Sequence, residues 1–148
     1  MKKIMTSRFG EIEAAEESII CFEVGIPAFE EEREFIIIPY EEDSPYVFLQ
    51  SVKTPGLAFL MTMPLTFFPD YEFTIDDEVE AELGLTSPEE VLIYAILTLS
   101  GNEIRDLTAN LMAPIVINAK TRKAKQIVLD RSAYTTKHRL FPAEKEER

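Results

Sequence analysis

Carboxylates are the most abundant side chains in this sequence that could carry chemistry. They gather in three short runs, Glu30–Glu32, Glu41–Asp43 and Asp76–Glu78. Two carboxylates held close together can act as general acid and base, so a hydrolytic or small-ligand-binding barrel that uses a carboxylate pair is one hypothesis. Each run, however, falls in a predicted turn or helix start, where solvation accounts for it. None has the alternating oxygen ligands and central glycine of a calcium loop.

The rest of the catalytic inventory is small. His138 is the single histidine and Cys21 the single cysteine, so a Cys/His zinc site cannot form. His138 is expected to pack or to face solvent, and Cys21, inside an apolar run, is expected to behave as a small hydrophobe. The five glycines are isolated, which excludes a phosphate-binding loop. We therefore expect no catalytic residue, no metal, no cofactor and no enzyme activity.

The most unusual stretch is residues 63–71, which contains three aromatic residues and two prolines. Prolines keep such a segment out of a central strand. Phe67 and Phe68 are therefore expected on a proline-stiffened loop, where they either plug one end of the fold or present rigid apolar anchors to a partner. Asp70 and Glu72 would give such a surface an acidic rim.

A basic stretch lies in the C-terminal third of the chain, with Lys120, Arg122, Lys123 and Lys125. We expect it in a hairpin loop that leads into a strand at Ile127–Leu129. These four cations could contact an anionic partner. Alternatively, they form a charged loop that discourages edge-to-edge pairing.

Strands must position these segments, because most apolar runs are of strand length or alternate with a period of two. The predicted strands are Ser18–Phe22, Phe35–Ile38, Phe48–Val52, Leu57–Thr62, Tyr71–Ile75, Val91–Leu99, Ile115–Asn118 and Ile127–Leu129. Helical signals are limited to Asp76–Gly84 and a turn at residues 87–90. The predicted fold class is all-β: an antiparallel meander forming a barrel-like single domain over residues 1–142, with one or two short helices. Residues 143–148 are predicted to be a flexible charged tail.

Composition limits the class of partner. The chain of 148 residues is 46% hydrophobic and carries a net charge of -12 at pH 7. Residues 1–104 contain 22 acidic and 5 basic side chains, a net of -17, whereas residues 105–148 contain 5 and 10, a net of +5. An acidic body disfavours direct nucleic-acid binding. No apolar run approaches the roughly 20 residues that cross a bilayer. A single cysteine fits a reducing cytoplasm.

Several short motifs, taken in order, resemble the flagellar assembly factor FliW family over essentially the whole chain. They are Gly25–Phe29, Glu42–Tyr46 with Leu49–Ser51, Phe68–Tyr71, Thr108–Asn118 and Lys125–Leu129. Ala28 and Ala124 stand where glycine is expected, which affects turn geometry more than family membership.

The resemblance implies a cytoplasmic binding protein without catalysis and with two protein partners. One partner is flagellin, held through its terminal helical region before export. The other is the carbon storage regulator CsrA, an RNA-binding translational repressor that the free factor binds and antagonises, relieving repression of flagellin translation. We expect a monomer when no partner is bound, and no direct contact with nucleic acid or membrane. The acidic body suits a basic RNA-binding partner and would repel RNA.

The matched segments and their chemistry predict a partner-binding site. Its residues are Tyr46, Phe67, Phe68, Pro69, Asp70, Tyr71 and Glu72. In this hypothesis Phe68 and Tyr71 are apolar anchors, while Asp70 and Glu72 select the charge of the partner.

Overall fold

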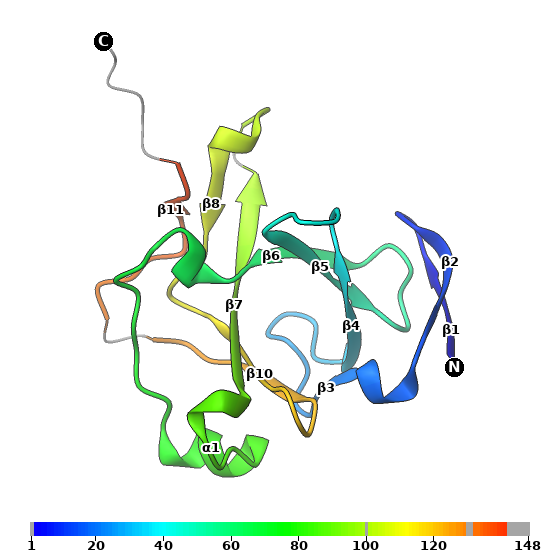
Figure 1. Ribbon diagram of the computed structural model, residues 1–148, viewed down its shortest axis with the longest axis horizontal. Coiled ribbons are helices and arrows are strands. Elements are labelled where there is room, and N and C mark those ends of the chain that lie inside the picture. Colours follow the sequence, from blue (N-terminus) through cyan, green and yellow to red (C-terminus); the bar gives the residue numbers. More distant parts are fainter. Residues whose placement is uncertain (1, 100, 130–131, 142–148) are drawn as a thin grey trace.

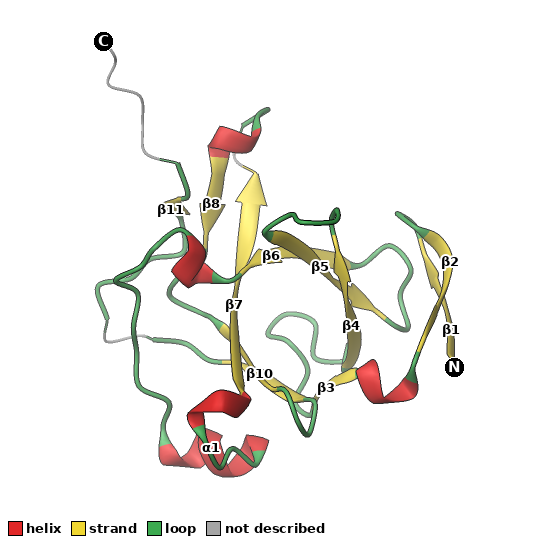
Figure 2. Ribbon diagram, viewed as in Figure 1, coloured by secondary structure: helices red, strands yellow, loops and turns green. Residues whose placement is uncertain are grey.

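The computed structural model describes residues 2–99, 101–129 and 132–141. Its strands are β1 (Lys2–Thr6), β2 (Gly10–Ala14), β3 (Ile20–Phe22), β4 (Glu34–Pro39), β5 (Tyr46–Ser51), β6 (Ala58–Thr62), β7 (Val91–Leu99), β8 (Leu107–Ala109), β9 (Ile115–Asn118), β10 (Lys123–Gln126) and β11 (His138–Arg139). The helical segments are α1 (Asp77–Leu83) and the 3-10 turns η1 (Glu16–Ser18), η2 (Pro64–Thr66), η3 (Pro88–Glu90) and η4 (Ile104–Asp106). Figures 1 and 2 show strands arranged in a ring, with α1 at its lower edge.

Seven strands close into a barrel. They pair in the order β7-β6-β5-β4-β3-β10-β9, and β9 pairs in turn with β7. The pair β3–β10 is parallel, through Cys21 opposite Lys123 and Phe22 opposite Ala124, whereas the other pairs of the ring are antiparallel. The predicted all-β, barrel-like domain with one or two short helices is confirmed. The parallel pair departs from a pure meander because a late strand returns to an early one.

Strand β7 extends beyond the ring, since it is nine residues long. Its first half, Val91–Tyr94, pairs with β9, and its second half pairs with β6 and β8. The second half, together with β8 and β11, forms an extension that projects from the barrel in Figure 1.

Apolar side chains fill the barrel interior. They are Ile20, Phe22, Ile26, Phe35, Leu49, Met61, Ile115, Ile117 and Ala124. Phe22 and Phe35 meet edge to face, with ring centroids 5.4 Å apart. A small barrel leaves just enough interior space for side chains. This interior is therefore a hydrophobic core.

The loop between β3 and β4 crosses the barrel opening in Figure 1 and places Ile26 in the interior cluster. Its turn uses left-handed backbone at Gly25 (φ +73°) and Ala28 (φ +74°). A Cβ at Gly25 would collide with the carbonyl of Glu30, so only glycine fits there. Ala28, where glycine is expected from the sequence, does adopt a conformation that favours glycine.

Most predicted strands are present, since β3, β4, β5, β6, β7 and β9 each overlap a predicted run. The prediction at Tyr71–Ile75 is wrong: this segment lies outside the strands, because no strand among the described residues pairs with it. The prediction at Ile127–Leu129 is displaced, since β10 ends at Gln126. Nevertheless, the N–H groups of Ile127 and Leu129 still donate to the carbonyls of Pro114 and Met112.

The short helices occur where they are predicted. Helix α1 lies within Asp76–Gly84, and Gly84 ends it with a left-handed φ of +67°. The turn expected at residues 87–90 is η3. The domain limit at residue 142 and the tail at 143–148 lie outside the described residues.

Candidate partner-binding surface

The aromatic loop, residues 63–73, follows β6 and packs against the outer side of β7. The carbonyl of Pro64 accepts hydrogen bonds from the N–H groups of Phe67 (3.0 Å) and Phe68 (2.7 Å). The N–H of Tyr71 then donates to the carbonyl of Phe68 at 2.9 Å. These successive turns, together with the fixed φ of proline, hold the loop in a defined conformation.

Tyr46 and Phe67, two of the predicted site residues, lie side by side. Their rings stack with centroids 6.1 Å apart and an interplanar angle of 16°. Phe67 also meets the edge of Phe141, 5.6 Å away. Both stacked residues are half-buried, so each contributes to the packing beneath the loop and leaves part of its ring at the surface.

Tyr71 supports the loop from beneath. It is only 7% exposed, and its hydroxyl donates to the carbonyl of Leu111 at 2.7 Å. Its ring lies 4.7 Å from that of Tyr134. Burial, and to a lesser extent the nearby Tyr134, raise the pKa of the Tyr71 hydroxyl. The predicted role of Tyr71 as an exposed anchor does not fit this position.

The remaining predicted residues of the loop reach the surface. Phe68 is half-buried with its ring edge against His138, while Pro69, Asp70 and Glu72 are exposed. A hollow of about 380 Å³ lies beside the loop, and its lining includes Phe68, Pro69, Asp70 and His138. The backbone of Glu72 is held by the Tyr134 hydroxyl, which lies 3.1 Å from both its N–H and its carbonyl oxygen. Glu72 therefore stands on a backbone held by hydrogen bonds, and Asp70 lies within the turn that the N–H of Tyr71 closes on the carbonyl of Phe68.

Residues 134–141 cover the aromatic loop, and sequence reasoning considered only His138 among them. Strand β11 pairs with β8, and the following Leu140 is buried. His138 Nε2 accepts a hydrogen bond from the N–H of Thr135 at 2.8 Å while its ring faces Phe68. The signal in the sequence was the return of apolar residues, Tyr134, Leu140 and Phe141, in an otherwise polar C-terminal region.

The basic stretch is largely paired within the fold. Its ion pairs are Lys120–Glu90 (3.6 Å), Lys123–Glu23 (3.5 Å) and Lys125–Glu82 (2.7 Å). Exposed pairs of this kind add little stability. They nevertheless offset three of the four cations. Lys120 and Arg122 lie in the hairpin loop, whereas Lys123 and Lys125 lie on strand β10.

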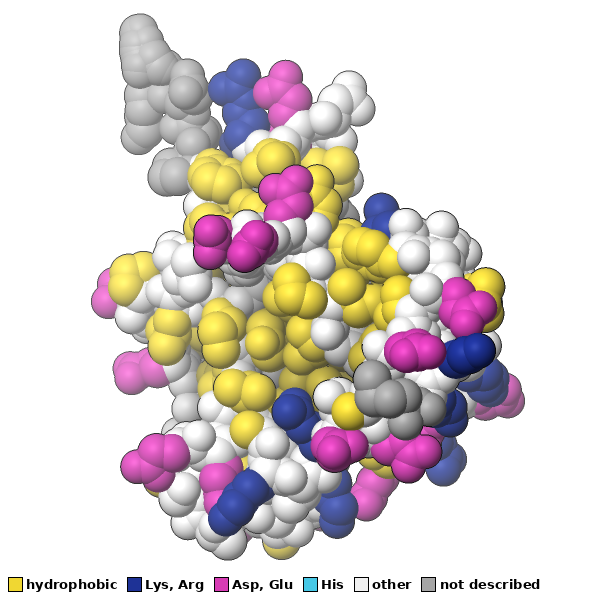
Figure 3. Space-filling view, turned by 45° about the vertical axis from the view of Figure 1, so that its right-hand side comes forward, with side chains coloured by type: hydrophobic (Ala, Val, Ile, Leu, Met, Phe, Trp, Pro, Cys, Tyr) yellow, Lys and Arg dark blue, Asp and Glu magenta, His cyan; other side chains and the backbone are white. Residues whose placement is uncertain are grey.

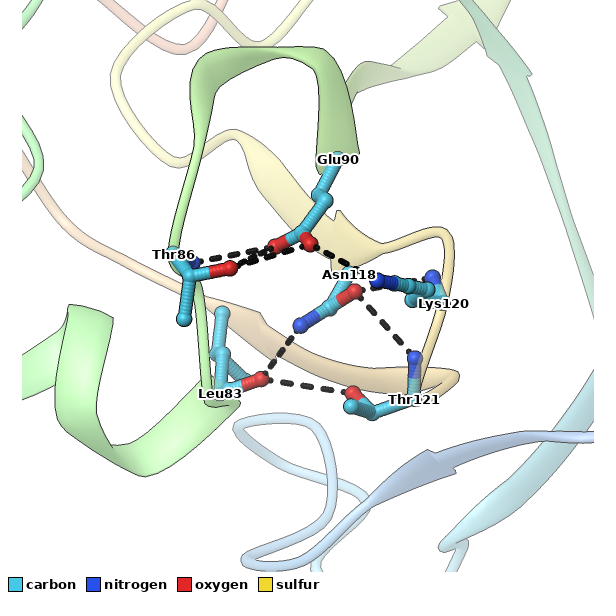
Figure 4. Close-up of polar contacts among 6 residues, drawn as sticks. All are labelled: Leu83, Thr86, Glu90, Asn118, Lys120 and Thr121. Carbon is cyan, nitrogen blue, oxygen red and sulfur yellow. Dashed lines mark hydrogen bonds and ion pairs between the residues drawn. The ribbon is translucent and has the colours of Figure 1, made fainter.

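Asn118 fixes the start of this hairpin loop to the end of α1, as Figure 4 shows. Its buried side-chain amide donates to the carbonyl of Leu83 at 2.7 Å, and its Oδ1 accepts from the N–H groups of Lys120 and Thr121. The neighbouring carboxylate of Glu90 accepts hydrogen bonds from the backbone and hydroxyl of Thr86. The pKa of Glu90 is lowered mainly by the hydrogen bond from the backbone N–H of Thr86. Lys120 lowers it to a smaller extent.

Two carboxylates of the described residues, Glu32 and Glu90, have shifted pKa values, and both shifts are downward. Hydrogen bonds from Ser51 and Thr54, each 2.6 Å, lower the pKa of Glu32. The pKa of Glu90 is lowered as well, whereas a general acid at neutral pH needs a raised one. Among the described residues, no group of three or more His, Cys, Asp or Glu could hold a metal. The interior of the barrel is filled by apolar side chains.

Fold and surface together define a class: a small closed β-barrel whose interior is a hydrophobic core and whose hollows lie on the outside. Within the described ranges, no helix is both long and apolar enough to cross a membrane. The chain belongs to the FliW family, because the family model described as FliW protein matches residues 3–140.

Individual relatives agree with this assignment. The flagellar assembly factor FliW of Geobacillus kaustophilus (strain HTA426) is 48% identical over 140 residues, covering 95% of this chain and 96% of its own length. That of Bacillus subtilis (strain 168) is 46% identical over 135 residues, covering 91% and 94%. A crystal structure of the flagellar assembly factor FliW matches with a TM-score of 0.90 at 44% identity, covering 97% of this chain and 99% of that chain. These relatives are named as assembly factors, which points to a role other than catalysis.

Proposed function

We propose that this FliW-family protein is a cytoplasmic, non-catalytic binding protein that holds flagellin. When free of flagellin, it binds and antagonises the translational repressor CsrA and so relieves repression of flagellin translation. In this proposal it contacts neither RNA nor membrane directly, and it is a monomer until a partner binds.

The observation that carries the proposal is the acidic edge of the aromatic loop. Asp70 and Glu72 are exposed near the half-buried ring of Phe68, and Tyr134 holds the backbone of Glu72. An RNA-binding partner presents basic surface, so an acidic edge attached to an apolar contact complements it. The net charge of -12 supports the same view, because three lysines of the basic stretch are paired within the fold and the chain keeps a large acidic excess.

Titration calorimetry of the full chain against purified CsrA, with and without purified flagellin, tests the proposal. We expect CsrA to bind and flagellin to suppress that binding. CsrA binding that flagellin leaves unchanged would contradict the exchange of partners. A folded sample that binds neither protein would overturn the proposed function.

A further inference from the structure

The imidazole of His138 fixes the turn that precedes it in the chain. Its Nε2 accepts a hydrogen bond from the N–H of Thr135 at 2.8 Å. The carbonyl of Thr135 in turn accepts hydrogen bonds from the N–H groups of Leu111 (3.1 Å) and Met112 (3.2 Å). Thr135 is therefore held on both sides, by the imidazole through its N–H and by the connection between β8 and β9 through its carbonyl.

This turn lies next to the contact that holds the acidic edge. Tyr134 directly precedes Thr135, and its hydroxyl lies 3.1 Å from both the N–H and the carbonyl oxygen of Glu72. The ring of Tyr134 also faces His138, with centroids 6.0 Å apart. A change at the imidazole therefore acts one residue away from the side chain that holds the backbone of Glu72.

Few other hydrogen bonds hold the turn. Strand β11 pairs with β8 over two residues only, His138 opposite Ala109 and Arg139 opposite Thr108. Within the turn, the N–H of Lys137 donates to Thr135 Oγ1 at a long 3.4 Å. The bond that His138 accepts is thus the shorter of the two side-chain bonds that close the turn.

Protonation would remove this bond. A neutral imidazole has one nitrogen that accepts a hydrogen bond, whereas both nitrogens of an imidazolium are donors. The Nε2–H of an imidazolium would point at the N–H of Thr135, so the two groups would repel each other.

Histidine is the side chain whose ordinary pKa allows its charge to change between pH 5 and 8. The chain contains a single histidine. The charged side chains visible in Figure 3 are lysine, arginine, aspartate and glutamate, whose charges are ordinarily constant between pH 5.5 and 7.0. A change of side-chain charge over this interval is therefore expected first at His138.

Asp70 is the carboxylate nearest in kind and place to act on this charge. It lines the same hollow of about 380 Å³ as His138, and it is the only carboxylate in that lining. No ion pair between described residues involves Asp70. An imidazolium would be attracted to Asp70 and would offset the negative charge of the acidic edge.

The other groups around the imidazole do not change charge in this interval. The two basic neighbours in the chain stay positive, the tyrosine hydroxyls in the hollow stay neutral, and the paired strand β8 carries uncharged residues. In that order they are Lys137 and Arg139, Tyr71 and Tyr134, and Thr108 and Ala109.

We propose that His138 is a pH-sensitive switch for the acidic edge of the aromatic loop. The neutral imidazole holds Thr135 and leaves Asp70 fully charged. The imidazolium releases the N–H of Thr135 and turns toward Asp70, which reduces the negative charge offered to a basic partner. The effect on the partner rests on the proposed function, whereas the change at Thr135 does not.

The first test follows the switch in the full chain without a partner. In NMR spectra, the ring protons of His138 and the amide of Thr135 should titrate together between pH 7.0 and 5.5. His138→Gln keeps an oxygen that can accept the bond but does not titrate, so its Thr135 amide should stay constant. Lys137→Gln is the matched control, because it changes the exposed neighbour and keeps the imidazole. It should retain the joint titration.

The second test measures affinity for purified CsrA by calorimetry at pH 7.0 and 5.5. The unaltered protein and His138→Gln should bind equally at pH 7.0. At pH 5.5 the unaltered protein should bind about threefold more weakly than the variant, since one exposed charge interaction changes an affinity by a factor of this order. Any pH dependence of CsrA itself is common to both measurements and cancels in the ratio.

The outcomes separate this inference from the proposed function. A Thr135 amide that does not follow the His138 ring, or a ring that does not titrate by pH 5.5, would overturn the switch. An affinity ratio that stays constant while the ring titrates would overturn its effect on the partner and leave the proposed function intact. No CsrA binding at either pH would overturn the proposed function, and the NMR titration would still decide the change at Thr135.

Discussion

At the scale of single residues, the aromatic loop contains one buried side chain that supports it and two charged side chains that reach the surface. Tyr71 lies beneath the loop, bonded to Leu111, whereas Asp70 and Glu72 on either side of it face solvent. The sequence identified this loop because prolines and aromatics alternate so closely there. It did not distinguish the buried ring of Tyr71 from the half-buried rings of Phe67 and Phe68, because the packing around Tyr71 includes Tyr134, which is more than 60 positions away in the chain.

Tyr71→Phe should destabilise the protein without affecting its partners. The change leaves the buried carbonyl of Leu111 without its hydroxyl donor, which costs about 1–2 kcal/mol in free energy of unfolding. Denaturant unfolding measures the loss, and calorimetry with CsrA should give an unchanged affinity. Tyr40→Phe is the control, because its exposed ring should make that change nearly neutral.

Asp70→Lys combined with Glu72→Lys should abolish CsrA binding and leave the thermal midpoint nearly unchanged, since both side chains are exposed. Glu11→Lys with Glu13→Lys repeats the charge change at the same spacing on an exposed strand away from the loop. This control should bind CsrA normally. An unaltered affinity in the first variant would remove the acidic edge from the binding site.

At the scale of elements, apolar runs predicted most of the barrel strands. Hairpin β1–β2 escaped prediction because its strands are mostly polar, and Ile4 is the one apolar residue among the two buried residues of β1. Residues 71–75, in contrast, have the alternating pattern of a strand but do not form one. Tyr71, Phe73 and Ile75 alternate with exposed residues because they pack on neighbouring elements, so the period of two appears without a partner strand.

The loop over the barrel opening gives a pH prediction at this scale. Hydrogen bonds from Ser51 and Thr54 lower the pKa of Glu32 below 4.5, so the folded state binds a proton less readily than the unfolded state. The stabilisation is therefore present above the unfolded pKa and is lost as pH falls through the folded pKa. Glu32→Gln should lower the thermal midpoint at neutral pH, and its difference from the unaltered protein should shrink in acid.

Glu31→Gln is the matched control for this measurement, because its carboxylate makes no hydrogen bond to any described residue. Its thermal midpoint should follow the unaltered protein at every pH. A Glu32→Gln difference that stays constant down to about pH 2 would contradict the role of the Glu32 charge.

At the scale of the whole molecule, the fold brings basic side chains of the C-terminal third next to acidic side chains of the rest of the chain. The C-terminal third is basic in sequence, but three of its lysines pair with Glu23, Glu82 and Glu90 from the acidic part. A count by segment cannot predict these pairs, because they depend on how the barrel closes. The surface that a partner approaches is therefore more uniformly acidic than the sequence suggests.

This acidic surface should accelerate encounter with a basic partner. We expect the association rate constant for CsrA to fall by about tenfold or more as ionic strength rises from about 0.01 to 1 M, because the Debye length shrinks from about 30 to 3 Å. Stopped-flow measurements test this, and the dissociation rate constant should change much less. An association rate that is independent of salt would contradict electrostatic steering.

The parallel pair β3–β10 also determines how much of the chain must be synthesised before the barrel can close. Strand β3 leaves the ribosome early, yet β10, its partner on one side, follows after roughly 100 more residues, or about 5–20 s of translation at ordinary rates. Until then one edge of β3 stays open and the ring is incomplete. Residues 134–141, which cover the aromatic loop, emerge later still. The closed ring and the covered aromatic loop are thus complete only after residues 134–141 have been made.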